Sequence, residues 1–187
     1  MDGLWGIEVR LQTDTGYASV PPCAGTGARA PFTVGERGRS LRTFTETLTF
    51  NTQKAPEFID ITDQVVDAVE RSQVRNGFVV VFSRHTTAAI KINENEPLLL
   101  QDMAHFLERV AAKDAYYGHN DFAIRTVHMH EDECPNGHAH CQHLMLGTSE
   151  SVPVVDGRLC FGQWQRIFLV ELDIPRRREV VVQVLGA

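Results

Sequence analysis

The stretch from Glu131 to Ser149 concentrates the side chains that most often carry out chemistry in proteins. It contains three of the eight histidines and two of the four cysteines: His138, His140, His143, Cys134 and Cys141. Imidazole and thiolate groups bind zinc and similar metals, and imidazole is also a general acid or base near neutral pH. The stretch therefore indicates a metal site or an acid–base site.

The spacing of these donors leaves the ligand set open. His138 and His140 are two residues apart and would share one side of an extended segment, whereas His140 and His143 would share one side of a helix. Only one of these pairs can be used at a time. Cys134 and Cys141 are conceivable ligands, but their spacing matches no zinc-finger or ribbon pattern. Because a catalytic zinc ion usually takes three protein ligands and keeps one open position, donors from other segments are also candidates.

Two histidines elsewhere in the chain are the best further donors. His85 and His119 each lie in a polar segment next to hydroxyl or amide residues that could orient the ring. An ordinary loop histidine is an equally good interpretation of His119. A functional role is favoured for His85, because Arg84, Thr86 and Thr87 stand beside it.

Anion binding is a second interpretation of the same polar segments. Arginine makes forked contacts to phosphate and hydroxyl groups add donors. The candidate substrate-binding residues are Arg84, Thr86, Thr87, Arg125, Thr148 and Ser149. Glu94 is the candidate general base or metal neighbour, with a solvated loop carboxylate as its alternative.

Composition limits the class of protein. A chain of 187 residues with 43% hydrophobic residues can bury a sizeable core. Its net charge of -6 argues against nucleic acid or an anionic membrane as a partner, since both are bound by clustered Lys and Arg. No apolar run approaches the roughly 20 residues that span a bilayer, and the amino terminus lacks the pattern of a signal peptide. We expect a cytoplasmic protein.

Residues 1–40 differ from the rest of the chain. Their prolines and glycines interrupt any regular period, so we interpret them as an extension of unknown role on a domain formed by residues 41–187. Within that domain, the Thr- and Phe-rich residues 41–50 predict a first strand. Helical spacing of apolar residues predicts one helix between Asp60 and Asn76 and another from Pro97 to Val110.

Strand patterns fill most of the remaining chain. The apolar run from Phe78 to Phe82 predicts a strand covered on both faces, and residues 88–92 predict another. Loose alternation from Ile124 to His130 predicts a strand with His128 and His130 on one face. Asp156-Gly157 predicts a hairpin, and residues 167–172 and 180–185 predict the last strands. About seven strands with two main helices favour an α+β fold.

A set of short motifs, in this order, carries a resemblance to a known family. They are His85-Thr86-Thr87-Ala88-Ala89, Ile92-Asn93-Glu94, Tyr117-x-His119, Ala139-His140, Gly147-Thr148-Ser149, Val152-Pro153-Val154, Gly157-Arg158-Leu159 and Gly162-Gln163-Trp164-Gln165. Over residues 41–186 the sequence resembles the YjbQ-like family, whose members are often regarded as secondary thiamine-phosphate synthases.

The resemblance implies a compact α+β domain with a β-sandwich, assembled as a homotrimer about a threefold axis. It implies sites near subunit contacts, where histidines matching His85, His119 and His140 hold a divalent metal, zinc above all, or an anion such as sulfate. The implied activity joins a pyrimidine methyl diphosphate to a thiazole phosphate and releases pyrophosphate.

One segment departs from the family pattern. Many relatives carry an acidic, Pro-containing segment before the Ala-His pair, where this chain has Cys134-Pro135-Asn136-Gly137-His138. The extra donors suit a metal better than a bare phosphate site. We therefore predict a metal-dependent enzyme acting on a phosphorylated small molecule. A non-catalytic trimer that binds a metal or phosphometabolite is one alternative, and a structural zinc site with Cys134 and Cys141 is another.

Overall fold

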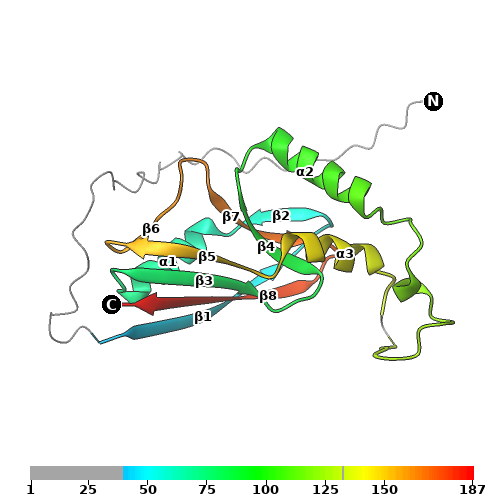
Figure 1. The fold of residues 1–187 in the computed structure, drawn as a ribbon, viewed down its shortest axis with the longest axis horizontal. Helices are drawn as coiled ribbons and strands as arrows, with labels where there is room; N and C mark the ends of the chain where they lie inside the picture. The colour runs from blue at the N-terminus through cyan, green and yellow to red at the C-terminus, as the bar shows by residue number, and fades with distance from the viewer. Residues whose placement is uncertain (1–39, 132) are drawn as a thin grey trace.

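The computed structural model describes residues 40–131 and 133–187, so the extension expected over residues 1–40 lies outside the described part except for residue 40. The described residues form eight strands, three α-helices and one short 3₁₀ helix (Figure 1). The strands are β1 (Arg42–Asn51), β2 (Glu57–Asp60), β3 (Gly77–Ser83), β4 (Ala88–Asn93), β5 (Ser149–Val155), β6 (Arg158–Leu159), β7 (Arg166–Glu171) and β8 (Arg177–Gly186). The helices are α1 (Thr62–Ser72), α2 (Pro97–Val110), η1 (Gly118–Asn120) and α3 (Gly137–Leu146).

The strands form two antiparallel sheets. The larger sheet has the order β1-β8-β3-β5-β6, and the smaller has the order β2-β7-β4. β8 is an inner strand of the larger sheet, because its Val181 lies opposite Thr47 of β1 on one side and Phe82 of β3 on the other. The architecture confirms a mixed fold of helices and antiparallel sheets.

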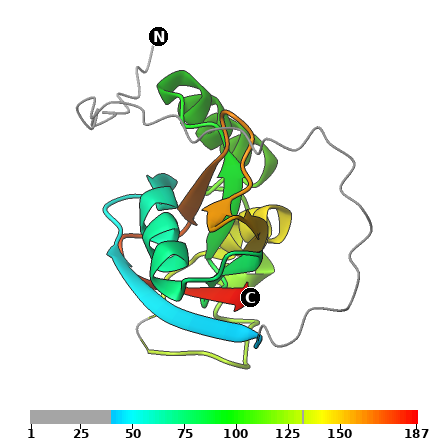
Figure 2. The same cartoon turned by 90° about the vertical axis from the view of Figure 1, so that its left-hand side faces the viewer.

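The main core lies between the inner face of the larger sheet, the smaller sheet and α1. α1 packs against β1, β6 and β8 (Figure 2), and its apolar stripe of Val65, Ala68 and Val69 is buried. The helix begins where Asp60 Oδ1 accepts a hydrogen bond from the Thr62 N–H at 3.0 Å. It ends before the predicted stop at Asn76, because Gln73 takes a left-handed conformation with φ of 56°.

A second, smaller core lies under α2 and α3. It consists of Ala89, Leu107, Ala139, Phe168, Val170 and Leu172. The start of α2 agrees with its sequence signals: Pro97 is its first residue, and the Glu96 carboxylate accepts hydrogen bonds from the Leu98 and Leu99 N–H groups at 2.9 and 2.7 Å. No helix within residues 40–131 or 133–187 has the length and apolar character needed to cross a bilayer.

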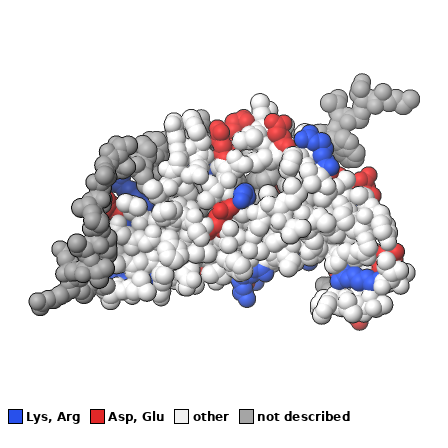
Figure 3. Space-filling model, in the orientation of Figure 1, with Lys and Arg blue, Asp and Glu red and all other residues white. Residues whose placement is uncertain are grey.

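The prediction that residues 78–82 form a strand covered on both faces is wrong. Val79 and Val81 are fully buried, but Phe78 is 43% exposed and Phe82 is 41% exposed. The strand alternates, because the core covers only the inner face of the larger sheet. Figure 3 shows few charged side chains over β3, β5 and β8, so the outer face combines apolar character with exposure.

The expected strand over Ile124 to His130 is also absent from the described residues. Ile124 and Arg125 both donate backbone N–H groups to the Asp121 carbonyl, at 3.2 and 2.9 Å, and this forms a turn. His128 has a positive φ of 52°, which ends any extended path. His128 and His130 therefore do not share a strand face.

The expectation of two main helices needs a correction as well, since α3 is a third one. α3 carries the histidine-rich stretch, so the helical alternative for His140 and His143 holds rather than the extended one. Its apolar residues follow no clear stripe: Ala139 is buried, whereas Leu144 is 85% exposed. The helix therefore lacks the periodic signal that identified α1 and α2.

Candidate functional site

Two histidines from separate segments meet at the amino-terminal half of α3. The rings of His119, in η1, and His140 are 4.8 Å apart between centroids, with their planes at 68°. The Gly137 N–H donates to Asn120 Oδ1 at 2.8 Å and ties η1 to the start of the helix. A Cβ on Gly137 would lie 2.5 Å from the Tyr117 Cβ, so the two segments meet this closely only because residue 137 is glycine.

An arginine and a glutamate lie beside this histidine pair. Arg125 Nη1 donates to Glu133 Oε1 at 2.5 Å and lies 3.4 Å from His119 Nε2. The hydrogen bond from Arg125 is the main cause that lowers the pKa of Glu133 below its ordinary value. The carboxylate is therefore ionised at neutral pH. An anionic ligand would have to share Arg125 with Glu133 or displace it.

The imidazoles of α3 are held in their neutral form. Burial is the main cause that lowers the pKa of His138, His140 and His143, and His119 adds to the effect at His140. His138 is only 4% exposed, and its Nδ1 is buried without a hydrogen-bond partner among residues 40–131 and 133–187. Within the same residues, His143 Nε2 and Asn136 Oδ1 are also buried without a hydrogen-bond partner. A neutral imidazole keeps the lone pair that binds a metal or accepts a proton.

These imidazoles predict how stability depends on pH. Each has a folded-state pKa below its ordinary value of 6.5, so the unfolded chain binds the proton first. We expect the melting temperature to be highest above pH 6.5 and to fall as the pH drops below it. The lowered pKa of Glu133 affects stability only below pH 4.5, the ordinary pKa of a glutamate. In that range stability is lost as the carboxylate is protonated.

Circular-dichroism melts across this pH range, at constant ionic strength, would check the prediction. His138→Gln should flatten the dependence because it removes one of the buried imidazoles. His130→Gln is the matched control, since His130 is exposed. A melting temperature that does not change between about pH 7.5 and pH 5 would contradict the assignment.

Asp173 anchors the start of α3 to the smaller sheet. This residue is 2% exposed, and its carboxylate accepts a hydrogen bond from Asn136 Nδ2 at 3.1 Å and pairs with Arg176 Nη2 at 3.0 Å. Cys134 Sγ lies 3.6 Å from the other Asp173 oxygen and accepts from Arg176 Nη2 at 3.3 Å. The Cys134 thiol therefore belongs to the hydrogen-bonded group of Asp173, Asn136 and Arg176.

A buried ion pair between Glu171 and Arg178 contacts the backbone of Asp173. Glu171 is fully buried and Arg178 is 4% exposed. Arg178 Nε donates to Glu171 Oε2 at 2.6 Å, Arg178 Nη2 makes a second contact to Oε1, and the backbone N–H of Asp173 donates to that Oε1 at 3.0 Å. Thr52 and Thr87 complete the network through their hydroxyls, at 3.0 Å from Glu171 and 3.1 Å from Arg178. The network fixes the end of β7 relative to β8.

The predicted residues of the β3–β4 loop lie around this network. His85 Nε2 accepts the Glu179 N–H at 2.8 Å, and burial followed by the charge of Arg178 lowers the pKa of His85. The neutral ring therefore carries its proton on Nδ1, and neither ring nitrogen offers a free lone pair. Arg84 is exposed and pairs with Glu179 at 2.9 Å, and Thr86 is exposed.

The remaining predicted residues lie in two further places. Ser83 donates its N–H to the Thr148 carbonyl at 2.8 Å, and Ser149 lies opposite Phe82, so the 148–149 turn adjoins the β3–β4 loop. Glu94 is half-buried between β4 and α2. The structure thus pairs His119 and His140 with Arg125 and arranges the other candidates in separate groups.

The fit to a metal ion is partial within one chain. Among the described residues, no group of three or more His, Cys, Asp or Glu side chains is placed to hold a metal. His119 and His140 fit as two neighbouring nitrogen donors. His85 in its present hydrogen bond does not fit, and Cys141 is exposed. A closed structural zinc site with Cys134 and Cys141 has no support in this arrangement.

Sequence reasoning missed the carboxylates and the buried arginine of this region. One signal was available: Arg178 precedes Val180, Val182 and Val184 with a period of two, which places a charge on the inward face of β8. A charge in that register requires a buried partner. Glu133 and Asp173 gave no comparable signal, since acidic residues in irregular segments are usually solvated.

These features define a class of protein: a small mixed α/β domain with antiparallel sheets, in which imidazoles, an arginine and buried carboxylates gather beside one helix. A family model described as UPF0047 protein YjbQ-like matches residues 46–187. The chain belongs to the YjbQ-like family, and this confirms the resemblance seen in the motifs.

Individual relatives agree with this assignment. A UPF0047 protein of Methanothermobacter thermautotrophicus is 43% identical, over 80% of this chain and 96% of its own length. One of Archaeoglobus fulgidus is 42% identical, over 74% of this chain and 98% of its own length. The crystal structure of a YbjQ-like protein of unknown function from Sulfolobus solfataricus has a TM-score of 0.71 and 36% identity, covering 79% of this chain and all of that one.

Proposed function

We propose that this protein is a metal-dependent enzyme that acts on a phosphorylated small molecule. The observation that supports the proposal best is the pair of neighbouring imidazoles, His119 and His140, next to Arg125. Burial favours the neutral, metal-binding form of His140. Arginine adds a planar, permanent cation that suits phosphate oxygens.

In this proposal His119 and His140 supply two nitrogen ligands to a divalent ion, with zinc the best match to imidazole donors. The remaining positions would be filled from outside the pair, by water, by substrate or by a further protein ligand. His85 remains the proposed third ligand, and it would have to release the Glu179 N–H to take that role. A bound divalent ion supplies Lewis acidity that stabilises negative charge on a leaving oxygen.

The other predicted residues keep their proposed roles toward the substrate. Arg84, Thr86, Thr87, Arg125, Thr148 and Ser149 are the proposed phosphate contacts, and Glu94 is the proposed base. Thr87 would act through the network, because it is 5% exposed and its hydroxyl accepts from Arg178. The substrate class suggested by the family resemblance is a pyrimidine methyl diphosphate plus a thiazole phosphate. In that reaction the thiazole nitrogen bonds to the methyl carbon and pyrophosphate leaves.

We further propose that the chain assembles as a homotrimer, in which the larger sheets meet about a threefold axis and the sheets of each chain form a β-sandwich. The outer face of the larger sheet supports this proposal, since Phe78, Phe82 and Val155 are each 38 to 43% exposed. Exposed apolar faces of this kind commonly form subunit contacts. Assembly would also place donors from a second copy near a site that is incomplete in one chain.

A second candidate is a trimer that binds a phosphometabolite or metal without turnover. One observation favours it: the guanidinium of Arg125 is already paired with Glu133 at 2.5 Å. Such a pair holds charge in place without providing acid–base chemistry. Pyrophosphate release measured on the metal-loaded protein separates the enzyme from the binding protein.

The first test of the proposal is the metal content of protein purified without added metal or chelator. We expect stoichiometric divalent metal per chain in the wild type, and loss of it in His140→Ala, because one of only two adjacent imidazoles is removed. Cys134→Ala is the matched control. It should keep the metal, because the Cys134 thiol is hydrogen-bonded to Asp173 and Arg176.

Light scattering on the same samples should give the mass of a trimer for all three proteins. Metal retained at full stoichiometry in His140→Ala would refute the ligand assignment. A monomeric wild type would refute the assembly but leave the ligand assignment standing.

A further inference from the structure

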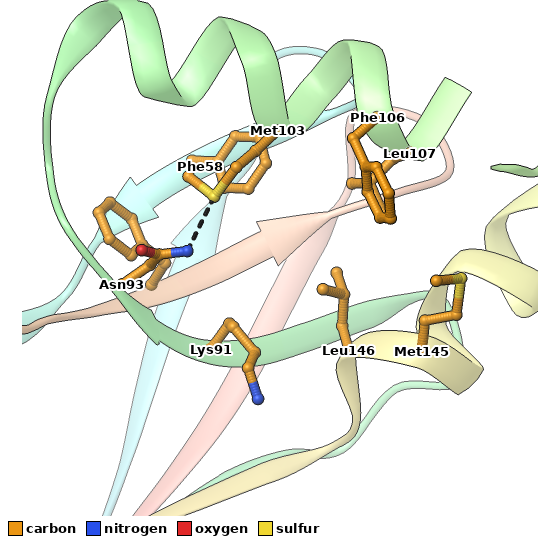
Figure 4. Close-up of a pocket in the computed structure, with 9 residues that line it drawn as sticks. Phe58, Lys91, Asn93, Met103, Phe106, Leu107, Met145 and Leu146 are labelled. Atoms are coloured by element: carbon orange, nitrogen blue, oxygen red, sulfur yellow. Dashed lines mark hydrogen bonds between the residues drawn. The ribbon is translucent and has the colours of Figure 1, made fainter. Parts of the chain in front are cut away.

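A cavity lies apart from the histidine pair, between α2, the end of α3 and the smaller sheet (Figure 4). Its volume is about 240 Å³. Its apolar lining comes mainly from Phe58, Phe168, Met103, Phe106, Met145 and Leu146. An engineered apolar cavity of about 150 Å³ in another protein stays dry and binds benzene, so this space suffices for a substituted aromatic ring.

The walls of the cavity suit a flat ring. Phe58 and Phe168 meet edge to face, with centroids 6.3 Å apart and planes at 85°. The thioethers of Met103 and Met145 are flexible and polarisable, and they make favourable contacts with aromatic rings. Phe106 is 46% exposed and Met145 is 49% exposed, so part of the lining is in contact with solvent. A ring can therefore enter without unfolding of a helix.

One hydrogen-bond donor at the cavity has a poor partner. Asn93 Nδ2 points at Met103 Sδ, 3.1 Å away, and a thioether sulfur is a weak acceptor (Figure 4). Asn93 Oδ1 accepts the Glu94 N–H at 2.9 Å, which fixes the orientation of the amide. Asn93 is exposed and lines the cavity, so the N–H group that is directed at Met103 can donate to the acceptor of a ligand in place of the sulfur.

The positive charge of the lysine that lines the cavity is neutralised by a neighbouring glutamate. Lys91 is the cation of the lining, and its Nζ pairs with Glu150 Oε1 at 2.6 Å. A carboxylate or phosphate ligand would gain little from a lysine that is already neutralised, and it would lose hydration against apolar walls. The chemistry of this cavity therefore differs from that of the histidine–arginine site.

We propose that this cavity is a second ligand site, which takes a neutral aromatic molecule of one ring with a short side chain that carries a hydrogen-bond acceptor. The ring lies against Phe58, Phe168 and the two thioethers, and the acceptor receives the Asn93 amide N–H. The proposal is independent of any metal and of the proposed function.

Three molecules of one shape test each part of the proposal. Acetophenone carries the ring and a neutral carbonyl acceptor. α-Methylstyrene replaces the carbonyl oxygen by CH₂ and removes the acceptor. Benzoate keeps the shape and adds a negative charge. We expect the preference for acetophenone over α-methylstyrene to be about fivefold greater with the Asn93 donor than without it, the value of one neutral hydrogen bond, because the carbonyl loses the same hydration in both proteins. We expect benzoate to bind most weakly of the three molecules.

The methionines supply the readout in the full-length chain. There are four, Met1, Met103, Met129 and Met145, and two of them line the cavity. With methionine labelled by ¹³C at the methyl group, acetophenone should shift the signals of Met103 and Met145 saturably. Met129 is 44% exposed and is not part of the lining, so its signal should not move. Met→Leu variants assign the signals.

The variant Asn93→Leu completes the test. The variant should lower the affinity for acetophenone about fivefold and leave the affinity for α-methylstyrene unchanged. Unchanged binding of α-methylstyrene also shows that the variant is folded. The comparison of benzoate with acetophenone and the methionine shifts use the wild-type protein, so they test the ligand class and the site even if this variant fails to fold. Equal affinity for benzoate and acetophenone would overturn the ligand class. Absence of saturable shifts at Met103 and Met145 with all three molecules would overturn the site itself.

Discussion

Replacement of Arg178 by Met is expected to lower the free energy of unfolding by about 3–5 kcal/mol. The variant leaves the fully buried Glu171 carboxylate without its cation and without two of its hydrogen-bond donors. Since domains of this kind are stable by only about 5–15 kcal/mol, the variant would lose a large share of its stability. Urea denaturation followed by circular dichroism measures the change.

Two comparisons isolate the cause. Arg177→Met changes the neighbouring arginine, whose side chain is 66% exposed, and should alter stability by less than about 0.5 kcal/mol. The double variant Arg178→Met/Glu171→Leu removes both charges and should recover part of the loss, because no unpaired carboxylate stays buried while the Asp173 N–H loses its acceptor. Arg178→Met as stable as Arg177→Met would show that the network does not hold the sheets in place.

Substitution of Gly137 by Ala is expected to separate the two histidines of the proposed metal site. The new Cβ would lie 2.5 Å from the Tyr117 Cβ, so the segment that carries His119 must move away from α3. We expect zinc affinity to fall about 10- to 100-fold, as for loss of a residue that orients a ligand. The added atom should also reduce stability by about 1–3 kcal/mol, which urea denaturation measures without reference to a metal.

Gly118→Ala is the matched control for this variant. It lies in the same short helix as His119, yet a Cβ there has no neighbouring atom within 4 Å. Zinc titration and urea denaturation of this variant should both resemble the wild type. If Gly137→Ala bound zinc as tightly as Gly118→Ala, the close approach of the two segments would have no role in the site.

Most of the regular elements could be predicted from the sequence because their signals are local. α2 has Pro97 at its start, a carboxylate cap and apolar residues at helical spacing, of which Leu107 is buried, and the β5–β6 hairpin has Asp156-Gly157. β2 was missed, since four residues are too few to show a period. α3 was missed because its buried side chains include polar ones, such as His138 and Gln142.

The site was only partly predictable, because long-range contacts build it. His119 and His140 were both candidates, but their pairing depends on η1 meeting the start of α3, which no local pattern encodes. The segment that contains Arg125 was predicted as a strand, yet side-chain bonds from Arg125 to Glu133 and to the His128 carbonyl shape it. Irregular segments of this kind have no period to detect.

The position of β8 bears on how the chain folds during synthesis. β8 follows every other strand in the sequence, yet it lies between β1 and β3 and makes the contacts that join them. β1 is translated early and has no neighbour in the larger sheet until residues 177–186 leave the ribosome. Its threonine-rich edge stays unpaired for most of translation, and long-range pairings of this kind form slowly. Arg178, which neutralises Glu171, also arrives with this strand, so burial of that carboxylate can be completed only as the sheet closes.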